Sequence, residues 1–231
     1  MRLVPIRRAV LACFVLLAGC NNVGRDYADT ALALVASRTD VVLGDSAIHA
    51  LRFPAVYLRI GDGPQVVAIL ALSELGEYKW VTSDRVLLTV REGRLLKLAG
   101  AGFGPLFTSG LESDPLRDPR SIDPDTRWTR QMDWQVGDDV LSNYTVEATY
   151  VVDRSVPKVV ANQARMLTRV RELNRVVQTG AEFTNEFWFD PADGVVLASR
   201  QYALPASVPV ELTTLKSPLP RTDARAPVAL H

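Results

Sequence analysis

The chain has 231 residues, a length that suits one domain, or at most two small ones, with a full hydrophobic core. Its 26 basic and 26 acidic side chains balance, which excludes the broad basic surface of a nucleic-acid-binding protein, so no nucleic-acid partner is expected. Because only two cysteines and two histidines are present, neither a zinc site nor another cofactor is predicted.

The first twenty residues have the pattern of a bacterial lipoprotein signal. Three arginines precede an uninterrupted apolar run over residues 9–17, and two small residues stand directly before Cys20. Such a run is too short to cross a bilayer, which needs about 20 apolar residues, so residues 1–19 are predicted to be a cleaved signal peptide. Cys20 is then the first mature residue and the predicted site of lipid attachment, carrying diacylglycerol and a further acyl chain such as palmitate.

This lipid anchor has two consequences for the mature chain. The residue after Cys20 is Asn21 rather than an aspartate, which by analogy with enteric bacteria indicates the outer membrane, facing the periplasm. Because Cys13 leaves with the signal and Cys20 is acylated, the mature protein is expected to have no free thiol and no disulfide. Its stability must come from packing.

After the lipid-anchored segment 20–25, the sequence predicts a short helix followed by many strands. Residues 26–37 have apolar side chains close to helical spacing. From about residue 53, short runs of strand-forming residues alternate with turn residues. The predicted strands cover 53–60, 65–72, 77–82, 85–90, 94–98, 127–136, 140–152, 182–189, 195–203 and 208–215.

Four other segments complete the predicted organisation. Residues 163–178 have apolar side chains at helical spacing, but their β-branched residues and strand neighbours favour a strand. Three glycines within 100–104 predict a bulge or corner, and 111–126 is predicted to be a proline- and aspartate-rich loop. The tail 217–231 is expected to be loosely ordered. Residues 26–216 are thus predicted to form one mainly β domain, either an antiparallel two-sheet sandwich or a curved open barrel with a short N-terminal helix.

One segment resembles the start of an esterase. Residues 41–46 read VVLGDS, similar to the strand followed by Gly-Asp-Ser that opens SGNH-type esterases, in which the serine is the nucleophile. A triad also needs a base held by a carboxylate. The two histidines, His49 and His231, do not lie in the Asp-x-x-His pattern of that family. A turn after a short strand is therefore favoured, and a hydrolase that uses Ser46 is kept as an alternative.

Clustered aspartates are a second source of possible chemistry. Paired carboxylates serve glycosidases and calcium sites, and a hydrolase that uses an aspartate pair stays open. Most of these residues stand beside glycine or proline, where the turn chemistry of aspartate explains them, and none fits the spacing of a calcium loop. No metal is predicted. The clustered aspartates are Asp114, Asp118, Asp123, Asp125, Asp138, Asp139, Asp190 and Asp193.

The aromatic residues are the better functional candidates. All four tryptophans, Trp80 among them, fall in predicted strands. Indole faces stack on sugar rings, and arginine pairs with acidic sugars. Because tryptophans in strands are usually buried, a core role is favoured for most of them. The candidate polysaccharide contacts are Trp128, Trp134 and Trp188, with Arg127 and Arg130 on either side of Trp128.

Several short elements follow one another along the mature chain: Pro54-Ala55, Gly93-Arg94, Asp133-Trp134, Phe187-Trp188, Ser199-Arg200-Gln201, Pro205 and Leu215-Lys216. Together with the lipoprotein signal, they resemble the YjbF/GfcB family of outer-membrane lipoproteins, linked to group 4 capsule and exopolysaccharide export. The resemblance implies a periplasm-facing accessory of polysaccharide secretion, beside an outer-membrane barrel partner and other export proteins. The resemblance assigns no catalytic residue to this chain.

Three functions therefore stay open. The first is a non-enzymatic lipoprotein that binds or chaperones a polysaccharide or scaffolds its secretion, and it is favoured by the anchor, the β domain and the resemblance. The second is a hydrolase that modifies the polysaccharide. The third is a carrier of lipid or lipoprotein, which needs a large apolar cavity.

Overall fold

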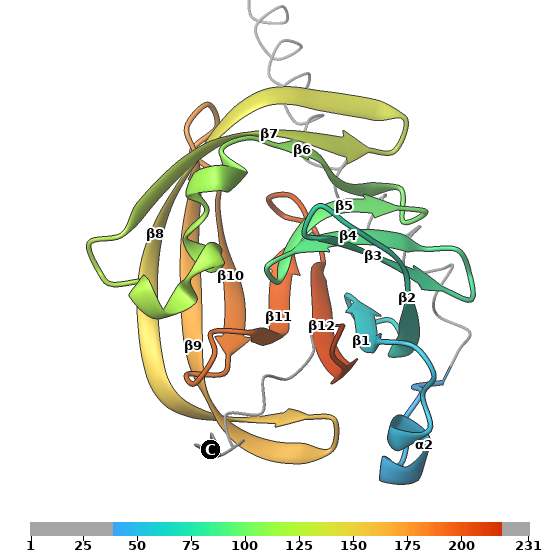
Figure 1. Cartoon of the computed structure of the whole chain (residues 1–231). Coiled ribbons are helices and arrows are strands. Elements are labelled where there is room, and N and C mark those ends of the chain that lie inside the picture. The colour runs from blue at the N-terminus through green and yellow to red at the C-terminus, as the bar shows by residue number, and fades with distance from the viewer. Residues whose placement is uncertain (1–38, 219–231) are drawn as a thin grey trace, which may run out of the picture.

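The computed structural model describes residues 39–218, which form one antiparallel sheet of 12 strands (Figure 1). The sheet curves into an almost closed barrel with the strand order β5-β4-β3-β2-β1-β12-β11-β10-β9-β8-β7-β6. Every pair of neighbours is consecutive in the chain except β1 and β12, so the sheet is a meander whose first and last strands join. Of the two predicted architectures, the curved open barrel is therefore confirmed.

The described elements are one short helix, twelve strands and three 3₁₀ turns. They are α2 (Asp45–His49), β1 (Ala55–Ile60), β2 (Val66–Glu74), β3 (Glu77–Thr82), β4 (Leu87–Arg91), β5 (Arg94–Ala99), β6 (Phe103–Thr108), the 3₁₀ turns Leu111–Ser113, Pro115–Arg117 and Pro119–Ser121, β7 (Arg127–Val136), β8 (Asp139–Val160), β9 (Gln163–Val176), β10 (Glu182–Phe189), β11 (Val196–Tyr202) and β12 (Pro209–Lys216).

Each predicted strand corresponds to an observed one, and β3, β7 and β10 have the predicted bounds. The ambiguous segment 163–178 contains β9 and is a strand, because its pairing with β8 and β10 outweighs the helical spacing of its apolar residues. The turns Glu92-Gly93 and Asp190–Gly194 connect antiparallel neighbours, as their sequences predict.

Three local predictions are wrong. Strand β6 was not predicted, because Gly104 and Pro105 interrupt its pattern, and its register with β7 shifts after Pro105. Strand β8 continues well beyond residue 152 through an irregularity between Asp153 and Val156. The segment around Ser46 is the helix α2 rather than a turn, and no strand precedes it among the described residues.

Apolar side chains fill the interior of the barrel in two main clusters. One joins β1 to β6 with β12 and includes Leu58, Trp80 and Leu98. The other joins β7 to β10 with the 3₁₀ turns and includes Leu116 and Phe187. The chain between β6 and β7, called the 111–122 segment below, is therefore packed onto the barrel wall as part of the core.

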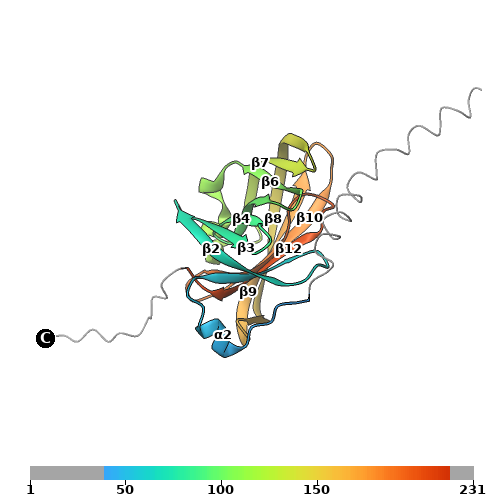
Figure 2. The same cartoon turned by 90° about the vertical axis from the view of Figure 1, so that its right-hand side faces the viewer.

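Figure 2, turned by 90° from Figure 1, shows α2 at the same end of the barrel as the long hairpin of β8 and β9. None of the helices described within residues 39–218 has the length and apolar character needed to cross a membrane. The predicted signal peptide, Cys20, the 26–37 helix and the tail from residue 219 lie outside the described residues.

Candidate functional site

A cleft of about 540 Å³ lies between the inner face of the barrel wall and the 111–122 segment. Its wall comes from β1, β3, β4, β11 and β12, and its rim includes the β4–β5 and β10–β11 turns. The volume is within the range of ligand-binding clefts. The apolar lining includes Val56, Tyr78, Trp80, Val90, Val196 and Leu212, and the polar lining includes Glu92, Arg117, Asp118, Arg120, Asp193, Ser199 and Thr214.

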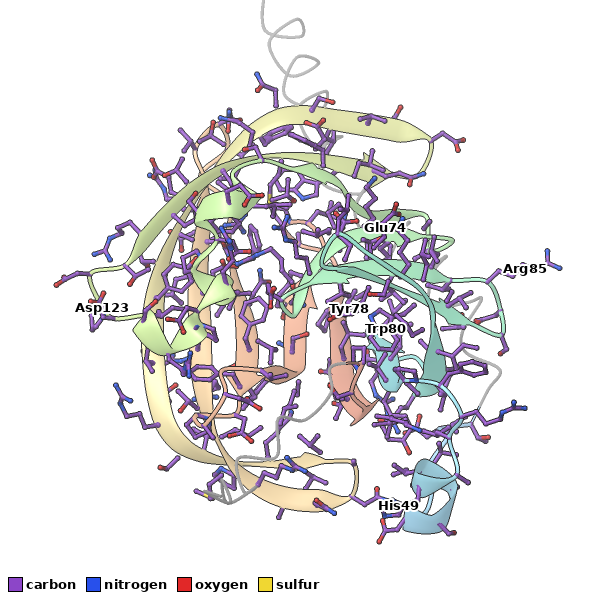
Figure 3. The ribbon with its side chains drawn as sticks, in the orientation of Figure 1. His49, Glu74, Tyr78, Trp80, Arg85 and Asp123 are labelled. Carbon is purple, nitrogen blue, oxygen red and sulfur yellow. The ribbon has the colours of Figure 1, made fainter. Side chains whose placement is uncertain are left out.

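Two aromatic side chains stand on the cleft side of β3. Tyr78 and Trp80 are two residues apart, so they project from one face of the strand, and their ring centres are 6.3 Å apart (Figure 3). Trp80 is 4% exposed, whereas Tyr78 is half-buried. Burial and the charge of Glu92 raise the pKa of the Tyr78 hydroxyl above its usual value. This hydroxyl therefore stays protonated at neutral pH and is able to donate a hydrogen bond to a ligand.

The charged rim of the cleft joins the 111–122 segment to the β10–β11 turn. The Nε of Arg120 donates to Oδ1 of Asp118 at 3.2 Å, and its Nη1 donates to the carbonyl oxygen of Ala192 at 3.5 Å. Gly194 leaves room for this arginine, because a Cβ at that position would lie 3.2 Å from the Arg120 Nε. The rim presents cations and anions side by side, which suits a ligand with many hydroxyl groups better than a ligand of one charge sign.

At the floor of the cleft, hydrogen bonds connect β5 to β11, two strands that are not neighbours in the sheet. Gly93 has a φ of +84°, and a Cβ there would come 2.6 Å from the Cβ of Val196, so the turn needs glycine for both reasons. The Nε2 of Gln201 donates to the carbonyl oxygen of Gly93 and to the Ser199 hydroxyl, each at 2.9 Å. Its Oε1 accepts a hydrogen bond from the Leu95 amide at 2.9 Å.

Directly behind this floor lies a buried ion network centred on Arg94. Its Nε and Nη2 donate to the two oxygens of Asp114 at 2.5 and 2.9 Å. Its Nη1 and Nη2 also donate to Glu172 at 3.1 and 2.8 Å. The guanidinium carbons of Arg94 and Arg130 each lie 4.4 Å from the Trp128 ring centre. All five side chains are buried.

Glu172 is the most heavily bonded carboxylate of this network. It accepts hydrogen bonds from the Tyr150 hydroxyl at 3.0 Å and the Asn185 amide at 2.9 Å, and Arg130 lies 3.5 Å away. Burial alone would raise the pKa of Glu172, but the charges of Arg94 and Arg130 and these hydrogen bonds outweigh burial and hold that pKa well below its usual range. Glu172 is therefore a permanent anion at cellular pH.

The network positions the rim of the cleft. Asp114 belongs to the 111–122 segment, and its Oδ1 also accepts from the Leu116 amide at 3.0 Å, capping the turn Pro115–Arg117. Because a buried charge without a partner is costly, Arg94 holds Asp114, and with it the segment that carries Arg117 and Arg120, against the barrel.

Most of the predicted polysaccharide contacts are not on the surface. Trp128, Arg130 and Trp134 project from β7 into the interior and are 2–4% exposed. Trp188 is on the outer face of β10 but is covered, with the Lys158 Nζ 4.1 Å from its ring centre. Only Arg127 is exposed, and its Nη1 donates to two backbone carbonyls of the preceding turn. In this conformation Arg127 alone of the five is able to touch a polysaccharide.

Half of the eight clustered aspartates accept hydrogen bonds within the turns that contain them. The side chains of Asp123, Asp190 and Asp193 each accept a backbone N–H two residues later in the chain. Asp114 accepts the Leu116 amide in the same way, but it is also buried against Arg94. Within residues 39–218 no group of three or more His, Cys, Asp and Glu side chains is arranged to hold a metal ion.

Ser46, the alternative nucleophile, lies on α2 and does not line the cleft. Its neighbour Asp45 accepts a hydrogen bond from the Asn162 amide at 2.9 Å. The Gly-Asp-Ser segment therefore attaches α2 to the β8–β9 hairpin.

The residues that line the cleft were largely missed from the sequence. The alternation of Tyr78 and Trp80 on one strand is a detectable signal, since it places two aromatic rings on the same face. For Glu92, Arg117 and Arg120 no local signal exists, because they meet only when the barrel closes and the 111–122 segment packs onto it.

Known proteins share both the sequence and the fold. The family profile described as "Group 4 capsule polysaccharide lipoprotein gfcB, YjbF" matches residues 28–215. The chain is 30% identical over 212 residues to the uncharacterized lipoprotein GfcB of Escherichia coli strain K12, spanning 91% of this chain and 99% of GfcB. It is 29% identical over 216 residues to the uncharacterized lipoprotein YjbF of the same strain, spanning 91% and 98%.

A solved structure also matches the barrel. The crystal structure of the hypothetical lipoprotein YmcC from Escherichia coli K12 superposes with a TM-score of 0.71 at 29% identity, covering 83% of this chain and 97% of YmcC. These matches confirm the resemblance drawn from the short sequence elements.

Proposed function

We propose, from the premise that this chain belongs to the YjbF family of group 4 capsule polysaccharide lipoproteins, that it binds a segment of capsule or exopolysaccharide in the cleft. In this proposal the protein assists secretion or assembly of the polymer and catalyses no reaction. It works beside an outer-membrane barrel and other export proteins.

The cleft beside Tyr78 and Trp80 is the observation that carries this proposal. Sugar rings present C–H groups that pack on aromatic faces and hydroxyl groups that hydrogen-bond to carboxylates, hydroxyls and guanidinium groups. The cleft offers both kinds of surface, with Tyr78 on the wall and Asp118 and Arg120 on the rim. A mixed lining of this kind favours a polyhydroxylated ligand over an acyl chain, so the lipid-carrier alternative is weaker.

The protein is proposed to act at the periplasmic face of the outer membrane. Support comes from the lipoprotein relatives and from the signal that ends at Cys20, which is followed by asparagine. Acyl chains on Cys20 contribute about 0.8 kcal/mol per buried CH₂ group to membrane binding. The anchor keeps the cleft close to the route of the exported polymer.

Binding is favoured over hydrolysis by the state of the charged groups. Three carboxylates line the cleft, Glu92, Asp118 and Asp193. Asp118 pairs with Arg120, and Asp193 caps its own turn. Ser46 is on α2, outside the cleft lining. The hydrolase alternative is therefore weaker, because Ser46 is outside the cleft and both aspartates that line the cleft are hydrogen-bonded within residues 39–218.

A pair of matched tyrosines tests the proposal. Tyr78 and Tyr144 are both half-buried beside a tryptophan, Trp80 and Trp134 respectively, but only Tyr78 lines the cleft. Calorimetry with capsular polysaccharide purified from the producing strain should show roughly tenfold weaker binding for Tyr78→Ala, equivalent to about 1.4 kcal/mol, and unchanged binding for Tyr144→Ala. Equal binding by both variants would refute the cleft as the site.

Cells provide the second readout. A strain without the gene should lose surface polysaccharide, and the Tyr144→Ala variant should restore it while Tyr78→Ala does not. Unchanged surface polysaccharide in the deletion strain would contradict the accessory role itself, independently of where the polymer binds.

A further inference from the structure

The far end of the β8–β9 hairpin exposes an apolar face. Pro157 pairs with Met166 and Val159 pairs with Ala164, so these four side chains project from the same side of the two strands. Val159 is 62% exposed and Met166 is 58% exposed. No charged side chain interrupts this outer face, because the intervening pair, Lys158 and Arg165, projects from the opposite side.

The opposite side of the hairpin end is packed against the barrel. Val160 and Leu167 are buried with Trp188 and Ala198, and Lys158 covers the Trp188 ring. The hairpin end is therefore held in place by its inner side. Its apolar outer face is a fixed part of the surface.

This face lies beside α2, which begins six residues after Thr39, the first described residue. The Nδ2 of Asn162, in the hairpin turn, donates to the carbonyl oxygen of Leu43 at 2.8 Å and to Asp45 at 2.9 Å. Figures 1 and 2 both show α2 next to the hairpin end. Val42, one residue before this contact, is 74% exposed and adds to the apolar surface.

The length of the intervening chain allows this face to touch the membrane that holds the anchor. Eighteen residues, 21–38, separate Cys20 from Thr39. Fully extended, they reach at most about 65 Å. A membrane that holds acyl chains on Cys20 is therefore within reach of the α2 end of the barrel and of the hairpin.

The charge of the hairpin is one-sided. Residues 154–171 contain five basic side chains and no acidic one. Arg169 and Arg171 pair with Asp153, and Arg169 also pairs with Glu186. The excess positive charge therefore comes from Arg154, Lys158 and Arg165. Arg154 is exposed, and Lys158 and Arg165 are half-buried. Because Lys158 and Arg165 project from the side opposite the apolar face, their charges act on a nearby anionic surface through space rather than by direct contact. Each such residue near an anionic surface strengthens its attraction to the membrane.

We propose that the outer face of the β8–β9 hairpin end, formed by Pro157, Val159, Ala164 and Met166, rests on the anionic lipid surface to which the anchor at Cys20 tethers the protein. The inference rests on the lipid anchor of the proposed function but not on polysaccharide binding. Contact at this end turns the opposite, β7–β8 end of the barrel away from the bilayer.

Two valines at opposite ends of β8 test the contact. Val159 and Val140 are similarly exposed, at 62% and 57%, but Val140 follows the β7–β8 turn, at the other end of the barrel from α2 (Figure 1). Because the mature chain is expected to have no other free thiol, Val159→Cys and Val140→Cys can each be labelled with an environment-sensitive dye. The labelled lipoproteins are reconstituted in vesicles of phosphatidylethanolamine and phosphatidylglycerol, after mass spectrometry confirms acylation of Cys20.

The dye at residue 159 should emit at shorter wavelength on the vesicles and be quenched several-fold less by aqueous iodide than the dye at residue 140. Equal quenching at the two positions would overturn the proposal. A contact between two copies of the protein would also protect residue 159 from iodide. In that case the dye would be equally protected in detergent without vesicles, and its protection would rise with protein concentration. This result would also overturn the proposal. Polysaccharide binding by the same samples reports separately on the proposed function.

Discussion

Arg94 of β5 and Glu172 of β9 are 78 residues apart in the chain, yet two hydrogen bonds of 3.1 and 2.8 Å join them across the interior of the barrel. Asp114 also pairs with Arg94, and it belongs to the 111–122 segment, which forms part of the rim of the cleft. Because both partners of Arg94 are buried, the stability of the barrel and the position of the 111–122 segment depend on the same ion network.

Removing one charge from this network should be costly. Glu172→Gln leaves Arg94 and Arg130 with Asp114 as the single buried counter-charge, and unpairing of a buried charge destabilises by about 3–5 kcal/mol. Urea unfolding followed by tryptophan fluorescence measures this loss. Glu211→Gln, which breaks a partly exposed pair with Arg200, is the control and should cost less than about 1 kcal/mol. Similar losses for the two variants would contradict a structural role of the network.

The contribution of Glu172 should depend on pH in a defined direction. Its pKa is lowered in the folded state, mainly by Arg94 and Arg130 acting against burial, so its stabilisation is complete above the unfolded-state pKa of about 4.3. The stabilisation is lost as the pH falls toward the folded-state value. The difference in unfolding free energy between the wild-type protein and Glu172→Gln should therefore shrink between pH 5 and pH 3, as measured by urea titrations. A difference that stays constant over this range would count against the assignment.

Gly93 should tolerate a side chain poorly. In Gly93→Ala the new Cβ meets Val196, so backbone strain adds to a steric overlap. Gly76 provides the control, because it has a similar φ of +80° but nothing within 4 Å of an added Cβ. Thermal unfolding should show Gly76→Ala losing about 1 kcal/mol from strain and Gly93→Ala losing roughly 1–3 kcal/mol more from overpacking.

Asp114 should control the order of the cleft rim. Asp114→Ala removes both the partner of Arg94 and the cap of the turn Pro115–Arg117, so the 111–122 segment should exchange its amide hydrogens at least tenfold faster. Polysaccharide binding should weaken although Tyr78 is intact. Asp123→Ala, in an exposed turn just beyond the segment (Figure 3), should leave both readouts unchanged. Unaltered exchange in Asp114→Ala would show that packing of Leu116 alone holds the segment.

The lipid anchor should depend on a single thiol. Cys20→Ala removes the acceptor of the acyl chains, so the protein should be released into the soluble fraction or remain unprocessed. Fractionation of cells followed by mass measurement tests this outcome. Retention of the processed variant in the membrane fraction would contradict anchoring through residue 20.

The arrangement of the strands was predictable because strand pairing in a meander is local. Each hairpin places a run of alternating residues beside the next run, as at Glu92-Gly93, and the turn chemistry is readable from neighbouring residues. For the same reason β6 was missed, since Gly104 and Pro105 remove the local pattern. Pairing with β7 keeps the segment in the sheet, and Gly104 leaves room for Leu98 of β5.

From sequence alone came the family and an antiparallel, mainly β fold, either sandwich or barrel, because both are read from neighbouring residues and their order. The signal ending at Cys20 is read in the same way and stays a prediction. Only the tertiary structure shows which face of each strand is buried in the interior of the barrel. Alternation places Trp128 and Arg130 on one face of β7, but only closure of the barrel makes that face an interior where Arg94 and Glu172 meet. The cleft beside Tyr78 arises in the same way, since its wall and rim come from segments that are distant in sequence and are joined only by the fold.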